Sequence, residues 1–203
     1  MAAAHAKPPK ATYADIESLP PHVTGQILFG VLYTQARPAT PHAHASSVLT
    51  MDVGGPFHRG RGGPGGWIIL DEPELHFGED VLVPDIAGWR RERMPELPKA
   101  AFLTLAPDWV CEVLSPSTSA LDRGDKLKVY AREGVPWVWL VDPAGRTLEV
   151  LSLDGASYRI LDVLSGDKPV RARPFDAIEL ELTAVFPSST DEPHEPSETS
   201  KTR

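Results

Sequence analysis

Residues 107–143 read PDWVCEVLSPSTSALDRGDKLKVYAREGVPWVWLVDP, and this stretch decides the fold. Its opening run WVCEVL predicts a strand whose two faces are both apolar apart from Glu112, which is typical of a central strand covered on both sides. Residues 116–135 predict a helix that has Ser and Thr caps at its start and Gly134 at its end. The run WVWLVDP predicts a second buried strand. Strand, helix and strand in succession indicate a sheet with helices packed on it.

The segments on either side add further strands and one long helix. Strand-like runs precede the central stretch at GWIIL, ELHF and DVLVPDIAGW, and the runs TLEVLSL and SYRILDV follow it around Asp154-Gly155, a strong hairpin signal. Residues 39–57 predict a helix capped by Thr40 and ended by the first glycines. Residues 54–66 are too rich in Gly and Pro for regular structure and predict a mobile surface loop. The expected fold class is therefore α/β, with a central mixed sheet.

Length and composition limit the domain organisation. The 203 residues suffice for one domain with a real core. We expect a flexible N-terminus over residues 1–12, one domain over residues 13–187 and a disordered acidic tail over residues 188–203. No apolar run reaches the roughly 18 residues of a membrane span, and the start lacks the hydrophobic stretch of a secretory signal. We therefore expect a soluble cytoplasmic protein that does not enter a membrane.

Charge and cysteine content exclude some classes of function. The formal net charge of −8 weighs against a sequence-independent nucleic-acid binder, which normally carries a basic excess. A metal site also needs clustered carboxylates, however, and a bound cation offsets part of their charge. The single cysteine, Cys111, excludes an internal disulfide and a cysteine-based zinc site.

Two carboxylates stand where a chain normally avoids them. Asp85 in VLVPDIAGW and Glu112 in DWVCEVLSP each lie inside a short apolar run that predicts a buried strand. A carboxylate there costs on the order of several kcal/mol unless a cation or hydrogen bonds compensate it. If the two strands are neighbours, both carboxylates can share one Mg²⁺ or Mn²⁺ ion, which takes oxygen ligands. Such an ion lowers the pKa of a bound water and neutralises phosphate charge, which predicts a phosphodiesterase site.

A lysine would complete this site, although each residue also has a plainer reading. Lys126 lies on the predicted helix after the Glu112 strand and would orient the water or stabilise the oxyanion. Alternatively, Asp85 caps a turn, Glu112 pairs with a buried arginine, and Lys126 forms a surface ion pair with Asp122 four residues earlier. Glu74 is a further carboxylate before a strand, and a loop acid of this kind is more often solvated.

The histidines and serines do not form a recognisable catalytic pattern. His42 and His44 are two residues apart, so on a helix they point to different sides and cannot chelate one ion. His58 and His76 have no metal-site spacing, and each histidine is expected to be exposed or hydrogen-bonded. Ser115 lacks the G-x-S-x-G elbow, which argues against a serine hydrolase.

The stretches VPDIAGWR, residues 107–143 and TLEVLSL resemble the Uma-type family of bacterial "putative restriction endonucleases", which belongs to the PD-(D/E)XK nuclease superfamily. The resemblance covers most of residues 18–187. It implies a restriction-endonuclease-like α/β/α core with a central mixed sheet, additional N-terminal helix and β-hairpin elements, and a divalent metal at the edge of the sheet. By this resemblance Asp85 takes the role of the PD aspartate and Glu112 that of the second acid.

The sequence departs from the pattern of this superfamily at two positions. The superfamily lysine stands two residues after the second acid, a position held here by Leu114, so Lys126 would have to supply the ammonium group from the helix. Gln26 stands where the N-terminal acid of the family is expected, which weakens any claim for a third metal ligand from that region.

Three hypotheses about function follow. The first is a Mg²⁺- or Mn²⁺-dependent endonuclease that hydrolyses DNA, with Asp85 and Glu112 on the metal, Lys126 assisting the water, and residues 54–66 as a substrate-side loop that carries His58, Arg59 and Arg61. The second is a nuclease-fold protein that binds a partner or nucleic acid without cutting it. The third is a metal-dependent hydrolase of small phosphate esters. A homodimer would place two sites on the two DNA strands.

Overall fold

The computed structural model describes residues 9–35 and 37–186. Most of its strands belong to a six-stranded sheet with the order β10-β9-β8-β7-β6-β3. The bounds are β3 (Trp67–Asp71), β6 (Ile86–Arg90), β7 (Trp109–Val113), β8 (Trp137–Asp142), β9 (Thr147–Asp154) and β10 (Ser157–Ser165). Strands β7 and β8 are parallel, and the other neighbours are antiparallel. The predicted mixed sheet and its Asp154-Gly155 hairpin are both confirmed.

A second, four-stranded sheet has the order β2-β1-β5-β4. Its strands are β1 (Thr24–Leu28), β2 (Val31–Gln35), β4 (Leu75–Phe77) and β5 (Asp80–Leu82). The prediction of one strand over DVLVPDIAGW is therefore wrong, because β5 belongs to this small sheet and β6 to the large one. The break falls at residues 83–85, where Pro84 has no N–H to donate to a ladder. Asp85 lies in this break, directly before β6.

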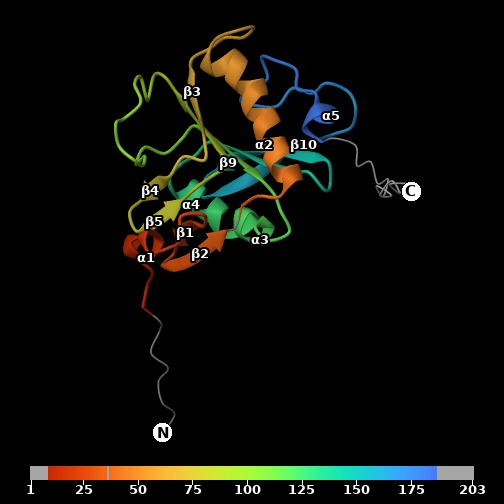
Figure 1. Ribbon diagram of the computed structural model, residues 1–203. Helices are drawn as coiled ribbons and strands as arrows, with labels where there is room; N and C mark the ends of the chain where they lie inside the picture. The colour runs from red at the N-terminus through yellow and green to blue at the C-terminus, as the bar shows by residue number, and fades with distance from the viewer. Residues whose placement is uncertain (1–8, 36, 187–203) are drawn as a thin grey trace, which may run out of the picture.

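Helix α2 (Thr40–Val53) crosses one face of the large sheet (Figure 1). Ala45, Leu49 and Val53 are buried, and their spacing of four residues places them on one side of the helix. The cap prediction is off by one residue, because Ala39 is the N-cap and Thr40 begins the helix. The chain continues into η1 (Gly54–His58), a π-helical turn, so the first part of the Gly-rich segment is regular after all.

The predicted helix after β7 is present as three consecutive pieces. These are α3 (Ser119–Leu121), the π-helical turn η2 (Asp122–Lys126) and α4 (Leu127–Arg132). Gly134, with a φ of 75°, follows it in the left-handed region, where glycine carries no steric penalty. The remaining helices are short: α1 (Tyr13–Glu17) and α5 (Leu182–Val185).

Helices cover both faces of the large sheet. On one face, Trp109 and Cys111 of β7 pack in a core that includes buried residues of α2 and α5. On the other face, Val110 packs in a second core with Val129 and Tyr130 of α4. This arrangement is the α/β/α layering that the sequence predicts, and β7 is covered on both sides as expected. Four of the five tryptophans are buried in these cores, namely Trp67, Trp89, Trp109 and Trp139.

The structure describes only part of the expected end segments. Residues 1–8 of the N-terminal segment and the whole predicted tail, residues 188–203, lie outside the described residues, as does Pro187. Within residues 9–12, the N–H of Ala11 donates to the carbonyl of Gly30 at 2.9 Å, and Thr12 caps α1. Among the helices of the described residues, none is both long enough and apolar enough to cross a membrane.

Candidate active site

Strand pairing brings Asp85 and Glu112 to the same end of the large sheet. Strands β6 and β7 are antiparallel, with Ile86 opposite Cys111. Asp85 precedes Ile86, so it lies beside the end of β7, where its Oδ2 accepts a hydrogen bond from the N–H of Val113 at 2.6 Å. The neighbouring strands that the sequence analysis required are therefore present. Asp85 also holds the end of the ladder, which is close to the turn-capping role considered as its alternative.

Glu112 is 1% exposed, and both of its carboxylate oxygens have partners. Lys126 Nζ donates to Oε2 at 2.8 Å, and the hydroxyl of Tyr130 donates to Oε1 at 2.5 Å. The alternative that Glu112 pairs with a buried arginine is wrong, because its cationic partner is Lys126. The residue spacing of the predicted helix places Tyr130 on the side that packs in the apolar core. That spacing could not show which group the hydroxyl of Tyr130 contacts.

Lys126 is as deeply buried as Glu112, at 2% exposure. Its Nζ also lies 3.0 Å from Oδ1 of Asp122, a charge contact rather than an aligned hydrogen bond, and 3.5 Å from the carbonyl oxygen of Val83. The alternative of a surface ion pair with Asp122 is therefore wrong about its location, since both partners are buried. Lys126 ends the π-helical turn η2, and such turns often occur at functional sites.

Carboxylates outnumber ammonium groups in this buried cluster. Burial raises the pKa of Glu112, Lys126 lowers it, and the charges of Asp122 and Asp85 raise it, so that the net pKa is about 8. Burial lowers the pKa of Lys126, but the charges of Glu112 and Asp122 outweigh it, so the net shift is upward and the ammonium stays protonated. The pKa of the Tyr130 phenol is raised well above its ordinary value by burial and by Glu112. One buried cation thus faces an excess of negative charge.

His42 is a site residue that the sequence analysis missed. The first turn of α2 directs its Nε2 to within 3.2 Å of Oδ1 of Asp85. Burial lowers the pKa of His42, but the hydrogen bond and charge of Asp85 outweigh it, so the net shift is upward. His44 points elsewhere, to the carbonyl of Ala184 at 2.9 Å, as the two-residue spacing predicts. The two-residue spacing excludes one metal shared by both histidines, but it does not exclude one histidine beside a carboxylate.

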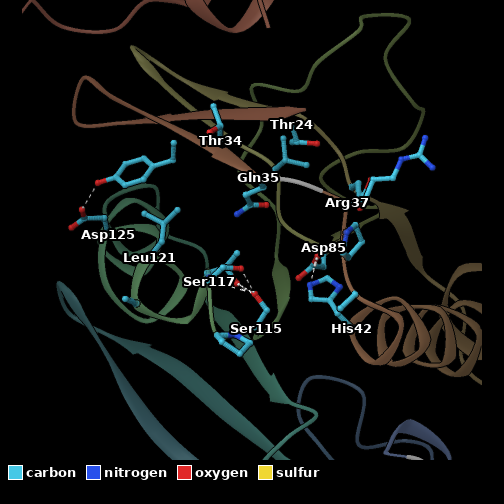
Figure 2. Close-up of a pocket in the computed structure, with 18 residues that line it drawn as sticks. Thr24, Thr34, Gln35, Arg37, His42, Asp85, Ser115, Ser117, Leu121 and Asp125 are labelled. Atoms are coloured by element: carbon cyan, nitrogen blue, oxygen red, sulfur yellow. Dashed lines mark hydrogen bonds and ion pairs between the residues drawn. The ribbon is translucent and has the colours of Figure 1, made fainter. Parts of the chain in front are cut away.

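Asp85 and His42 open into a pocket of about 720 Å³ (Figure 2). Val83 and Glu72 also line it, whereas Glu112 and Lys126 are not among its lining residues. Glu72 was also missed. Its N–H donates to the carbonyl of Asp85 at 2.9 Å, and burial, together with the charges of Asp71 and Asp85, raises the pKa of its carboxyl. The rest of the lining comes from β1, β2 and residues 115–125.

A model of the Uma2 family, described as "Putative restriction endonuclease", matches residues 12–184. The chain belongs to the Uma2 family. Among solved structures, it is similar to a putative nuclease belonging to DUF820 from Anabaena variabilis. The identity is 22%, the alignment covers 87% of this chain and 97% of that chain, and the TM-score is 0.70. At this identity the likeness shows the Uma2 fold alone. No curated protein matches the sequence.

Two further residues considered from the sequence have other partners in this Uma2 chain. Glu74 accepts hydrogen bonds from Tyr13 at 2.9 Å and from His76 at 2.7 Å, so it is engaged away from Asp85. Gln26 is fully buried, and its Oε1 accepts from the N–H of Val83 at 2.9 Å. Gln26 therefore holds the backbone just before Pro84 and Asp85.

The Gly-rich segment of the Uma2 chain is not beside Asp85. His42 lies in the first turn of α2 and the segment follows the end of the helix, so about 12 residues at 1.5 Å each separate them by roughly 18 Å. Figure 1 shows this segment at the opposite end of α2 from the small sheet. Ile69 N–H donates to Nδ1 of His58 at 3.0 Å, which is a structural role. The segment therefore lies too far from Asp85 to contact the same phosphate, and its expected role as a substrate-side loop with His58, Arg59 and Arg61 stays a prediction.

The donor chemistry of the Uma2 site suits a hard divalent cation. Within residues 9–35 and 37–186, no group of three or more His, Cys, Asp or Glu side chains is arranged to hold a metal ion. Mg²⁺, however, commonly takes only one or two carboxylates and completes its shell with water and substrate oxygens. A carboxylate oxygen has two lone pairs, so Asp85 and Glu112 keep acceptor capacity beside their present hydrogen bonds. A cation would also offset the excess of buried negative charge.

Proposed function

We propose that this protein is a Mg²⁺- or Mn²⁺-dependent endonuclease that hydrolyses DNA phosphodiester bonds. The observation that carries the proposal is the convergence of Asp85, Glu112 and Lys126 at the end of β6 and β7, beside the pocket. These three residues come from distant parts of the chain. Membership of a family described as "Putative restriction endonuclease" supports the same proposal.

Asp85 and Glu112 would hold the cation, since both carry carboxyl oxygens at one end of neighbouring strands. When bound, the ion would supply charge neutralisation at the phosphate and lower the pKa of a bound water. The protein holds both carboxyl groups in place before a cation binds. The Val113 N–H orients Asp85, and the Tyr130 hydroxyl orients Glu112. His42 holds the second oxygen of Asp85 from α2.

Lys126 would contribute a fixed positive charge. Its ammonium is held by Glu112 and Asp122 and is kept protonated by their charges. A preorganised cation stabilises charge that develops on the phosphoryl oxygens, and it costs no reorganisation during the reaction. Because the side chain comes from η2 rather than from β7, Leu114 is free to pack in the apolar core. The migration of the ammonium group to the helix is thus compatible with the observed packing.

Plasmid cleavage in Mg²⁺ or Mn²⁺ tests this proposal. We expect Asp85→Asn and Glu112→Gln each to lower the cleavage rate about 100-fold or more. Mutation of residues that only hydrogen-bond to the ligands of a metal site already lowers metal affinity or activity by typically 10–100-fold. Asp154→Asn and Glu79→Gln are matched controls on exposed acids and should cut like the parent. Circular dichroism would confirm that each variant is folded. Cleavage that survives EDTA, or that is undiminished in both site variants, would contradict the proposal.

A second candidate is a protein of this fold that binds a partner or nucleic acid without cutting. The engagement of every oxygen of Asp85 and Glu112 by the protein itself favours it, as does the net charge of −8. Titration calorimetry with Mn²⁺ separates the two candidates. Absence of binding through the millimolar range, together with no cleavage of any nucleic acid, would favour the binding protein.

Two further expectations stay predictions. A homodimer would present two sites to the two strands of DNA, and light scattering at micromolar concentration would measure it. A cytoplasmic location would be tested by fractionation of cells that express the full chain.

A further inference from the structure

The pocket beside Asp85 is enclosed on several sides and small. Strands β1 and β2 form one wall and residues 115–125 the facing wall. Tyr33 of β2 and Asp125 of η2 join these walls, with the phenol hydroxyl donating to Oδ2 at 3.4 Å. Figure 2 shows Thr34 and Gln35 above Ser117 and Leu121, with Asp85 and His42 to the right of both pairs. A scissile phosphate has to enter this space to reach Asp85.

From these walls we infer that the site takes a single nucleic-acid strand, or a locally unpaired one, rather than an intact duplex. The inference rests on the proposed nuclease function and deepens it. A volume of about 720 Å³ corresponds to a sphere roughly 11 Å across. The major groove of a B-form duplex alone is about 12 Å wide, so the whole duplex cannot enter. One strand with its bases unstacked can.

The charges of the side chains that line the pocket also favour a single strand. Among the described lining residues, Arg37 is the one Lys or Arg side chain, whereas Glu72, Asp85 and Asp125 are acidic. A duplex presents a negative charge about every 1.7 Å along its axis, and a protein that binds it neutralises several phosphates with Lys and Arg. A single strand presents a charge about every 3.4 Å. A lining with one arginine therefore suits the lower phosphate charge density of a single strand.

Uncharged hydrogen-bonding groups and one aromatic ring supply the remaining contacts. Polar side chains from both walls line the space, namely those of Thr24, Thr34, Gln35, Ser115, Ser117 and Thr118. Hydroxyls and amides bind phosphate and sugar oxygens without adding charge. The ring of Tyr33 lines the same pocket, and an unpaired base can stack on an aromatic face whatever its sequence. The stacking contact requires a base that is free of its complementary strand, and the phosphate and sugar contacts can be made to a single strand.

The test uses one oligonucleotide sequence in three forms, incubated with the full chain and Mn²⁺. The forms are a single strand, a blunt duplex and a duplex with an unpaired central bubble. We expect the single strand and the bubble to be cut at least about tenfold faster than the blunt duplex. Equal or faster cutting of the blunt duplex would overturn the inference and leave the proposed function intact.

Tyr33→Ala gives a second measurement on the same site. Loss of one base–aromatic stack should raise KM for the single strand by about tenfold or more. Val31→Ala is the matched control, because Val31 is exposed on the same strand and does not line the pocket. An unchanged KM in Tyr33→Ala would remove the stacking role and count against the inference.

Binding separates the failure of the inference from the failure of the proposed function. If none of the three forms is cut, fluorescence anisotropy with the Asp85→Asn variant compares its affinity for the single strand and the duplex. Tighter binding of the single strand, without cleavage of any form, would support the strand preference and contradict the proposed nuclease activity. Equal binding, or tighter binding of the duplex, would overturn the strand preference as well.

Discussion

The two faces of strand β7 carry opposite chemistry within five residues. On one face, Trp109 packs edge-on against Trp139 with ring centroids 5.0 Å apart and against Phe175 at 4.7 Å. On the other face, Glu112 holds a buried lysine and a tyrosine hydroxyl through hydrogen bonds. Both faces are almost completely removed from water.

The difference shows how one strand serves stability and chemistry together. The aromatic face gains free energy from burial that depends little on direction, so it tolerates small adjustments. The charged face is held by hydrogen bonds and charge contacts that need exact partners, because an unpaired buried charge costs several kcal/mol. The aromatic core on one side therefore compensates for the charges concentrated on the other.

The largest effect is expected on the aromatic face. Trp139→Ala should lower the free energy of unfolding by about 3–5 kcal/mol through the cavity it leaves, and by about 1 kcal/mol more through the lost hydrogen bond to the carbonyl of Arg173. Urea unfolding measures the change. A loss below about 1 kcal/mol would mean that this face is not the main source of stability.

A loss almost as large is expected on the charged face. Lys126→Met leaves Glu112 and Asp122 buried without their cation, which should cost about 3–5 kcal/mol in urea unfolding. Lys128→Met removes an exposed lysine two residues away and should cost at most about 1 kcal/mol. Adding Glu112→Leu to Lys126→Met should recover part of the loss. Equal costs for the two lysine variants would show that the buried pair has no special weight.

The smallest change in the free energy of unfolding, counted per pH unit, is expected from a change of pH. This change is confined to the charged face of β7. The pKa of Glu112 is raised from an ordinary 4.5 to about 8 in the folded chain. Its contribution to stability is therefore fully present below pH 4.5 and is lost as the pH rises towards 8. The free energy of unfolding should fall by at most about 1.4 kcal/mol per pH unit in this window.

Unfolding of the parent and of Glu112→Gln between pH 5 and 8, without divalent ions, measures this slope. The slope should be smaller in Glu112→Gln, which cannot titrate, while Trp139→Ala should keep the slope of the parent. Parallel pH profiles for the parent and Glu112→Gln would show that Glu112 does not titrate in this window.

Local patterns in the sequence anticipated much of the fold and part of the site. Alternation in WVCEVL identified β7 as a doubly covered strand, and its single carboxylate drew attention to Glu112. The predicted helix after β7 carries Lys126, which was expected to act beside Glu112. In the structure Nζ of Lys126 lies 2.8 Å from Oε2 of Glu112. These inferences succeed because the periodicity of strands and helices is a property of neighbouring residues.

Other parts of the site depended on contacts that no local pattern records. His42 and Glu72 reach Asp85 only because α2 and the end of β3 are folded against the start of β6. The split of DVLVPDIAGW between two sheets was missed for the same reason, since an apolar run does not say which sheet it joins. The composition of the Gly-rich segment suggested a substrate-side loop, but it could not give the distance of that segment from Asp85.

The sequence by itself determined the order of strands and helices, the burial of β7 and the presence of an unusual acid within it. Side-chain period and turn chemistry are local, and they are legible in the chain. The tertiary structure alone decided that Tyr130 and Lys126 divide the two oxygens of Glu112 between them and that His42 takes Asp85. Those contacts arise from strand register and helix packing, in which residues far apart in sequence meet because buried charges require partners.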